Sequence, residues 1–156
     1  MAVVLHHDSG YFNPHFAIYD TMSIIKIYQY PDPVLRLKTS QISSFDDDLA
    51  QLIEDMADTM YDAPGIGLAA PQVGESVKLI VVDTTKEPEG EKQYMALINP
   101  EIVSHEGTQL DEEGCLSVPE LTANVKRYKK ITVAYQDRDG KPHELTTEDR
   151  FAVVLQ

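Results

Sequence analysis

The chain has 156 residues, of which 42% are hydrophobic and 25% charged, a composition typical of an ordinary globular protein. This length predicts one domain around one core. A formal net charge of −13 argues against binding to nucleic-acid phosphates, and every apolar run is shorter than the roughly 20 residues needed to span a bilayer. The single cysteine, Cys115, excludes an intramolecular disulfide and is compatible with a reducing compartment.

The first 21 residues differ from the rest, because they contain three of the five histidines and no Lys or Arg. The lack of basic residues argues against a secretory signal and against an Arg-rich transit peptide. Alternating apolar residues begin at Met22 and lead into a Pro-Asp-Pro turn. We therefore predict an N-terminal appendage over residues 1–21 and one domain over residues 22–156.

Residues 43–62 have the pattern of an amphipathic helix, because apolar side chains recur at steps of three and four residues. Ser44 is the predicted N-cap, since Asp47 follows three residues later and acidic side chains suit the positive end of the helix dipole. Pro64 and Gly65 are predicted to end the helix.

Segments rich in β-branched residues follow this helix. They predict strands over residues 77–83, 94–100 and 101–104, and a β-hairpin over residues 131–147 with a type I′ turn at Asp139-Gly140. The polar residues 86–92 predict a surface loop.

A final helix is predicted to begin at Thr146 or Thr147, because a threonine followed by Glu148 and Asp149 is a suitable N-terminal cap. Residues 151–156 contain five apolar side chains and no stop signal, so we expect a buried helix that is cut short. Together the elements predict an α+β fold, with antiparallel or mixed β-sheets packed around a helix.

Two stretches have residue types that suggest chemistry. The first is GIGLAAPQVG at residues 65–74, where two glycines allow a ligand to approach the backbone and the amide of Gln72 is able to donate to a developing oxyanion. A glycine-rich turn between helix and strand explains the same residues without any chemistry.

The second stretch is DEEGCLSVPE at residues 111–120. Its acidic residues disfavour Cys115 as a thiolate nucleophile, whereas a thiol that ligates a metal is deprotonated by the ion itself. The local charge therefore favours a metal ligand over a nucleophile. An inert cysteine is the alternative interpretation.

Together these stretches resemble the peptide deformylase family, which carries the motifs G-x-G-L-A-A-x-Q, E-G-C-L-S and Q-H-E-x-x-H in this order. The sequence has GIGLAAPQ at residues 65–72 and EGCLS at residues 113–117, and the resemblance extends over residues 22–156. It implies a cytoplasmic hydrolase that removes the formyl group from the N-terminal methionine of nascent chains at the ribosome.

The resemblance also implies roles for single residues. Cys115 corresponds to the thiolate ligand of a divalent metal. In the family this metal is usually Fe²⁺, and Zn²⁺, Ni²⁺ or Co²⁺ can replace it. Its ligands are one Cys, two His and a water. The oxyanion donors correspond to the Gln72 amide and the Leu116 backbone N–H. The substrate cleft corresponds to the strip Gly65, Ile66 and Gly67, with Glu113 near its mouth.

The third motif is where the chain departs from the family. None of its five histidines has a second one four residues away, as His-Glu-x-x-His requires. The segment RFAVVLQ at residues 150–156 matches the apolar run and the glutamine before that motif. We therefore expect the chain as given to be truncated, to retain no metal and to be inactive, because two His ligands and the Glu base are absent.

Two alternatives remain. A non-catalytic relative would bind formyl-methionyl peptides or a protein partner, and it needs a stably folded chain, which a cooperative thermal transition would show. A cysteine-dependent hydrolase would pair Cys115 with His143, although the acidic surroundings of the thiol disfavour this.

Overall fold

A computed structural model describes residues 23–85 and 93–156. The appendage predicted over residues 1–21 and the loop predicted over residues 86–92 lie outside the described residues. The elements in chain order are the 3₁₀ helix η1 (Pro33–Arg36), α1 (Asp47–Asp62), β1 (Gly67–Ala69), the 3₁₀ helix η2 (Ala70–Val73), β2 (Leu79–Val82), β3 (Met95–Glu106), β4 (Gln109–Cys115), β5 (Val118–Arg127), β6 (Lys130–Gln136), β7 (Pro142–Glu148) and α2 (Asp149–Val154).

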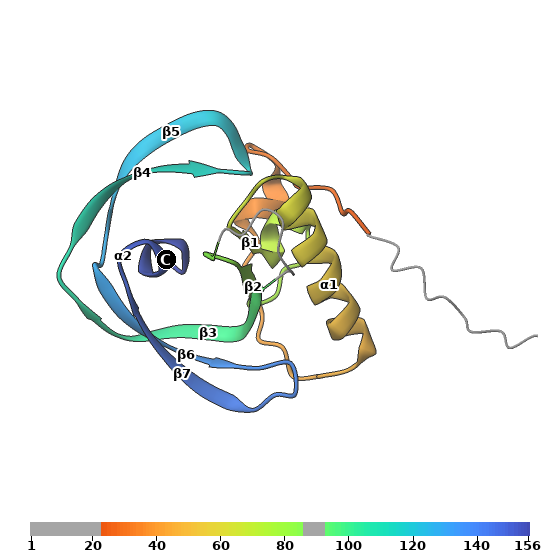
Figure 1. Cartoon of the computed structure of the whole chain (residues 1–156). Helices are drawn as coiled ribbons and strands as arrows, with labels where there is room; N and C mark the ends of the chain where they lie inside the picture. The colour runs from red at the N-terminus through yellow and green to blue at the C-terminus, as the bar shows by residue number, and fades with distance from the viewer. Residues whose placement is uncertain (1–22, 86–92) are drawn as a thin grey trace, which may run out of the picture.

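The strands form two antiparallel sheets (Figure 1). One sheet has five strands in the order β1-β2-β3-β6-β7, and the other is the β4–β5 pair. The predicted α+β fold with antiparallel sheets is confirmed. The short α2 lies inside the curve that the long strands make (Figure 1), so the predicted packing of sheets around a helix is also confirmed.

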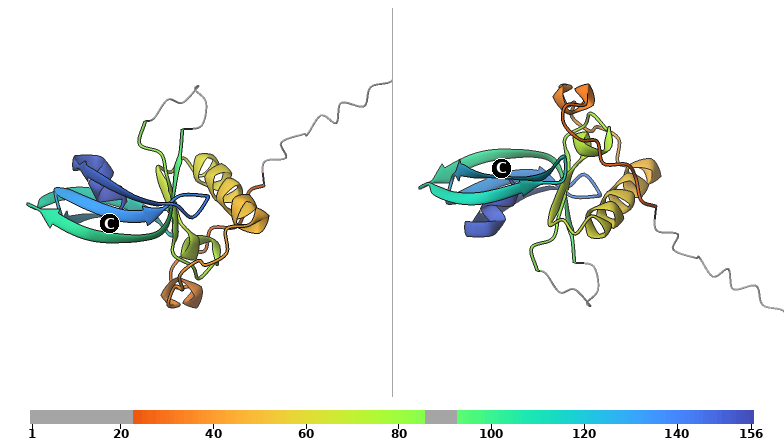
Figure 2. Two further views of the ribbon diagram at one scale, coloured as in Figure 1. Left: turned by 90° about the horizontal axis from the view of Figure 1, so that it is seen from below. Right: turned by 90° about the horizontal axis from the view of Figure 1, so that it is seen from above.

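The two helices cover opposite faces of the central strands (Figure 2). Side chains alternate between faces along a strand. On β2, Val81 therefore packs in the cluster that includes α1, whereas Val82 packs in the cluster that includes Ala152 of α2. Ile98 and Leu97 divide in the same way on β3. Strand β1 lies between the two helices, because Leu68 packs in the α1 cluster and Gly67 faces Val154 of α2.

The predicted amphipathic helix is present as α1, and its apolar stripe, including Ile53, Met56 and Met60, is fully buried. The predicted N-cap is wrong. Asp46 caps the helix by accepting a hydrogen bond from the Leu49 backbone N–H at 3.1 Å, and Ser44 instead donates its hydroxyl to Asp46 at 2.6 Å. The helix consequently begins at Asp47.

The two strands predicted over residues 94–104 are one strand, β3, with an irregularity in its pairing to β6 between Ile98 and Glu101. Asn99 has a positive φ of 53° there. Pro100 has no N–H to give to the ladder and is therefore tolerated at a bulge. Because pairing resumes beyond it, the proline bends the strand without ending it.

The predicted hairpin over residues 131–147 is confirmed as β6–β7, but its turn is not type I′. Gly140 has a φ of 79°, and its N–H bonds the Asp137 carbonyl at 2.9 Å. Arg138 and Asp139 lie between these two residues, and neither has the positive φ that a type I′ turn requires. This is the longer hairpin turn that ends in a left-handed glycine.

The predicted start of the final helix is also wrong. Thr146 and Thr147 pair with Thr132 and Ile131, so β7 runs on to Glu148 and α2 begins at Asp149. β-branched threonines fit a pleated strand as well as a cap position. Pairing with β6 decides between the two.

Candidate active site

The first motif leads from the end of α1 through β1 and η2 to Gly74, which has a φ of 94°. Pro71 is in the first turn of η2, where its fixed φ and missing N–H suit a helix start. This turn places Gln72 so that its Oε1 accepts a hydrogen bond from the Ala69 backbone N–H at 2.9 Å.

The second motif forms the end of β4 and the tight turn into β5. Cys115 is the last residue of β4 and is exposed. The turn consists of Leu116, which is partly buried, and Ser117, which is only 4% exposed. The Ser117 carbonyl accepts a hydrogen bond from the Tyr30 backbone N–H at 2.8 Å, which ties this turn to the N-terminal segment.

The two motifs meet at the Gln72 amide. Its Nε2 lies 3.8 Å from Cys115 Sγ and 3.1 Å from Ser117 Oγ. A second contact joins Gly65 to Leu116, because a Cβ added to the glycine would lie 2.8 Å from Leu116 Cδ1. Residues that are more than 40 positions apart in the sequence therefore form one site.

Helix α2 packs on β1, next to the two motifs. A Cβ on Gly67 would lie 2.7 Å from Val154 Cγ1, so the absence of a side chain on Gly67 allows α2 to pack directly on β1. The Gln156 side chain exchanges two hydrogen bonds of 2.9 Å with the backbone of Tyr128. These contacts hold α2 against both β1 and the end of β5.

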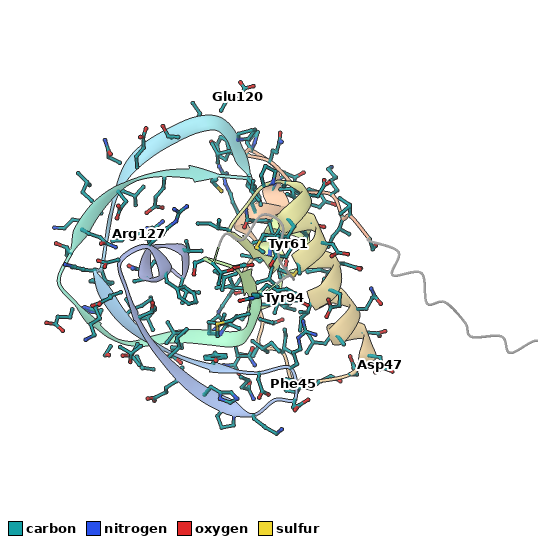
Figure 3. The ribbon with its side chains drawn as sticks, viewed as in Figure 1. Phe45, Asp47, Tyr61, Tyr94, Glu120 and Arg127 are labelled. Atoms are coloured by element: carbon teal, nitrogen blue, oxygen red, sulfur yellow. The ribbon has the colours of Figure 1, made fainter. Side chains whose placement is uncertain are left out.

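Glu113, expected near the mouth of the substrate cleft, forms a two-bonded ion pair with Arg127 at 2.9 and 2.8 Å. The hydrogen bonds that the Arg127 guanidinium donates to Glu113 raise the pKa of that guanidinium. Arg127 also donates to the Gln156 carbonyl at 3.2 Å. Figure 3 shows Arg127 next to α2, so the pair links the cysteine-bearing strand to this helix.

Sequence reasoning missed two residues of this site. Ser117 belongs to the second motif, and its place two residues after the candidate ligand Cys115 was the available signal. Asp83 follows β2, and its N–H donates to the Ile66 carbonyl at 3.0 Å. Its side chain accepts a 2.5 Å hydrogen bond from Tyr61, and burial raises the pKa of that tyrosine. Asp83 thus holds the middle of the Gly65–Gly67 strip.

The histidines of the described region lie on the five-stranded sheet and have other partners. His105 stacks on Tyr128 with ring centroids 3.8 Å apart, and His143 contacts Asp137 at 2.7 Å. In residues 23–85 and 93–156, no group of three or more His, Cys, Asp or Glu side chains is arranged to hold a metal. The donor set around Cys115 is therefore one thiol, which does not fit a metal ion by itself.

The site provides the thiol and the amide donor of a thiolate-ligated metallohydrolase, on two antiparallel sheets that enclose a short helix. The profile of the Polypeptide deformylase family matches residues 24–156. The chain belongs to this family, whose members hydrolyse the formyl group of N-formyl-methionyl peptides.

Relatives and solved structures agree with this assignment. The peptide deformylase of Desulfotalea psychrophila is 64% identical over 135 residues, which are 86% of this chain and 80% of that protein. The peptide deformylase of Syntrophobacter fumaroxidans is 50% identical, with 86% and 79% covered. The crystal structure of a peptide deformylase from Legionella pneumophila has a TM-score of 0.81 and 48% identity over 85% of this chain and 77% of that one. The Thermotoga maritima enzyme has a TM-score of 0.79 and 41% identity, with 85% and 87% covered.

No helix in the described parts of the chain has the length and apolar character needed to cross a membrane.

Proposed function

We propose that the site between the two motifs serves the removal of the formyl group from the N-terminal methionine of nascent chains, in the cytoplasm at the ribosome, when the ligands of the third motif are also present. The observation that carries the proposal is the meeting of Gln72 with Cys115, because it sets an amide donor beside the thiol that the family resemblance implies as a metal ligand. Membership of the deformylase family supports the reaction class.

The substrate would lie along Gly65, Ile66 and Gly67, as the family resemblance implies. This strip has one strand residue and two loop residues, and the bond from Asp83 fixes its middle carbonyl. Leu116 packs over Gly65 and adds an apolar wall. Glu113, held in its ion pair with Arg127, would lie near the mouth of this cleft.

Two donors would bind the formyl oxygen as it becomes negatively charged. They are the Gln72 Nε2 group and the Leu116 backbone N–H, and both lie next to Cys115 in space or in sequence. Such donors lower the barrier because they are already oriented when the charge develops, and losing one costs about 10²–10³ in kcat.

Cys115 would supply the thiolate ligand of a divalent metal, Fe²⁺ by family resemblance, with Zn²⁺, Ni²⁺ or Co²⁺ as possible replacements. A bound metal in such enzymes activates water for attack. These 156 residues contain no His-Glu-x-x-His segment, so we propose that on their own they retain no metal and do not turn over substrate.

The test is to join a segment that carries the third motif of a relative to Gln156 and to measure formate release from a formyl-methionyl peptide. We call this protein the extended chain. We expect turnover by the extended chain and loss of bound metal and turnover in its Cys115→Ala variant. Equal turnover in that variant would overturn the role of Cys115.

The control is an extended chain in which both histidines of the added segment are replaced by alanine. It keeps the same length and the same first two motifs. We expect it to be inactive, because a thiolate alone binds the ion weakly.

A further inference from the structure

Ser117 has no role in the proposed chemistry, although it lies next to Leu116 and its side chain is inside the site. The residue is 4% exposed, and a buried hydroxyl needs a hydrogen-bond partner. Its Oγ accepts a hydrogen bond from Gln72 Nε2 at 3.1 Å. The question is whether this bond serves the turn or the glutamine.

The contacts of Gln72 show which way its amide faces. The Ala69 backbone N–H is only a donor, so the atom that it contacts at 2.9 Å must be the carbonyl oxygen of the amide. The NH₂ end therefore points away from Ala69 and toward the β4–β5 turn. The terminal torsion of a glutamine side chain has broad preferences. Rotation of the Gln72 amide is therefore restricted by hydrogen bonds at both its oxygen and its NH₂ group.

The NH₂ group has two hydrogens and two neighbours. One neighbour is Ser117 Oγ at 3.1 Å, and the other is Cys115 Sγ at 3.8 Å, which is a long contact. When Ser117 takes one N–H, the second N–H faces Cys115 Sγ, and this long contact leaves it able to donate instead to an oxygen bound beside the thiol. That is where a formyl oxygen would lie.

We infer that Ser117 is a positioning residue for Gln72: its hydroxyl takes one amide N–H, so that the other is aimed at the reacting oxygen. This inference rests on the proposed function, because only there is the second N–H an oxyanion donor. The backbone bond from Tyr30 to the Ser117 carbonyl does not involve the hydroxyl. Removing the hydroxyl therefore tests positioning separately from the structure of the turn.

The experiment measures the order parameter of the Gln72 side-chain amide by ¹⁵N relaxation in the 156-residue protein. The signal is identified as the side-chain amide peak that is missing from Gln72→Glu. We expect an order parameter of about 0.85 for this amide in the wild type, as in rigid backbone, and below about 0.6 in Ser117→Ala. Ser117→Thr keeps the hydroxyl and should restore the high value.

The matched control is Ser104→Ala, which removes an exposed hydroxyl from β3 and should leave the Gln72 signal unchanged. If Ser117→Ala does not fold, Ser117→Cys gives the same comparison, because it replaces the hydroxyl by a thiol, which is a weak acceptor, and leaves no cavity. An unchanged order parameter in a folded Ser117 variant would overturn the inference.

This readout does not depend on catalysis. If Ser117→Ala loosens the amide but Gln72→Ala leaves formate release by the extended chain unchanged, positioning stands and the oxyanion role of Gln72 fails. The two claims are thus separable.

Discussion

Single polar side chains connect distant parts of this molecule. Asn99 is an example, because its amide bonds both the N–H and the carbonyl of Ile42 at 2.8 Å and also contacts Gln136 at 2.7 Å. Gln72 has a comparable position between two motifs, whereas Asp137 accepts hydrogen bonds inside a single hairpin turn. Replacing any of them leaves buried or capped groups without partners, which is the larger part of the cost.

Gln72→Ala in the extended chain tests the oxyanion role at the scale of one residue. The change removes one of two donors that act mainly in the transition state. We expect kcat to fall by about 10²–10³ with KM nearly unchanged. Formate release at varied peptide concentration separates the two constants, and a change confined to KM would contradict the assignment.

Asp137 predicts a pH-dependent contribution to stability. The hydrogen bond with His143 lowers the pKa of this carboxyl from its ordinary value of 3.8. A carboxyl with a lowered folded-state pKa stabilises the protein above its unfolded-state pKa of about 3.9 and loses this contribution as the pH falls through the folded-state pKa. Asp137→Asn should therefore be less stable than wild type at pH 7, with a difference that shrinks below about pH 4.

Urea denaturation at a series of pH values measures this difference. The control is Asp139→Asn in the same turn, whose ion pair with Lys141 is 69% exposed on both sides and is expected to contribute little. A difference for Asp137→Asn that stays constant down to pH 2 would show that the carboxylate charge is not involved.

At the scale of elements, the apolar pattern of the sequence predicts the type and place of a helix well and its first residue poorly. The apolar spacing of α1 is a local property, and the helix is where the pattern indicates. The starts of α1 and α2 differ from the predicted ones. Asp46 replaces Ser44 as the cap of α1, and pairing with β6 keeps Thr146 and Thr147 in β7. Such pairing depends on contacts that are not local.

The packing of α2 on β1 predicts that Gly67 tolerates no side chain. An added Cβ would lie 2.7 Å from Val154 Cγ1, which is the rigid branch of a partly buried residue. We expect Gly67→Ala to lower the free energy of unfolding by about 1–3 kcal/mol, as overpacking typically does.

Two variants control for this effect. Val154→Ala in the Gly67→Ala background removes the clash and should recover part of the loss. Gly114→Ala adds a Cβ with its nearest neighbour at 3.9 Å and should change stability much less. Equal free energies of unfolding for the two glycine variants would contradict the close packing of α2.

For the whole molecule, the motifs identify the family and the candidate residues, whereas the site itself depends on tertiary structure. The spacing of GIGLAAPQ and EGCLS points to Gln72 and Cys115, and the fold brings them into contact. The pairing of Gln72 with Ser117 was not predictable in this way, since serines in turns usually bond nearby backbone. The α+β class followed from the order of periodicities along the chain.

The donor set of the described residues predicts weak metal binding. One thiolate occupies one of the four positions of a tetrahedral site, and the described residues offer no group of three ligands. We expect the 156-residue protein, loaded with Fe²⁺ or Zn²⁺ and then dialysed, to hold far less than one ion per chain. Stoichiometric metal together with turnover would contradict this expectation.

The measurement that tests the central claim most directly compares two peptides in the extended chain, loaded with metal. One carries an N-terminal formyl-methionine, and the other carries acetyl-methionine. A site shaped by Gln72, Cys115 and Leu116 to remove formyl groups should release formate from the first and little or no acetate from the second. A folded, metal-loaded extended chain that releases no formate, or that releases both acids equally, would contradict the account.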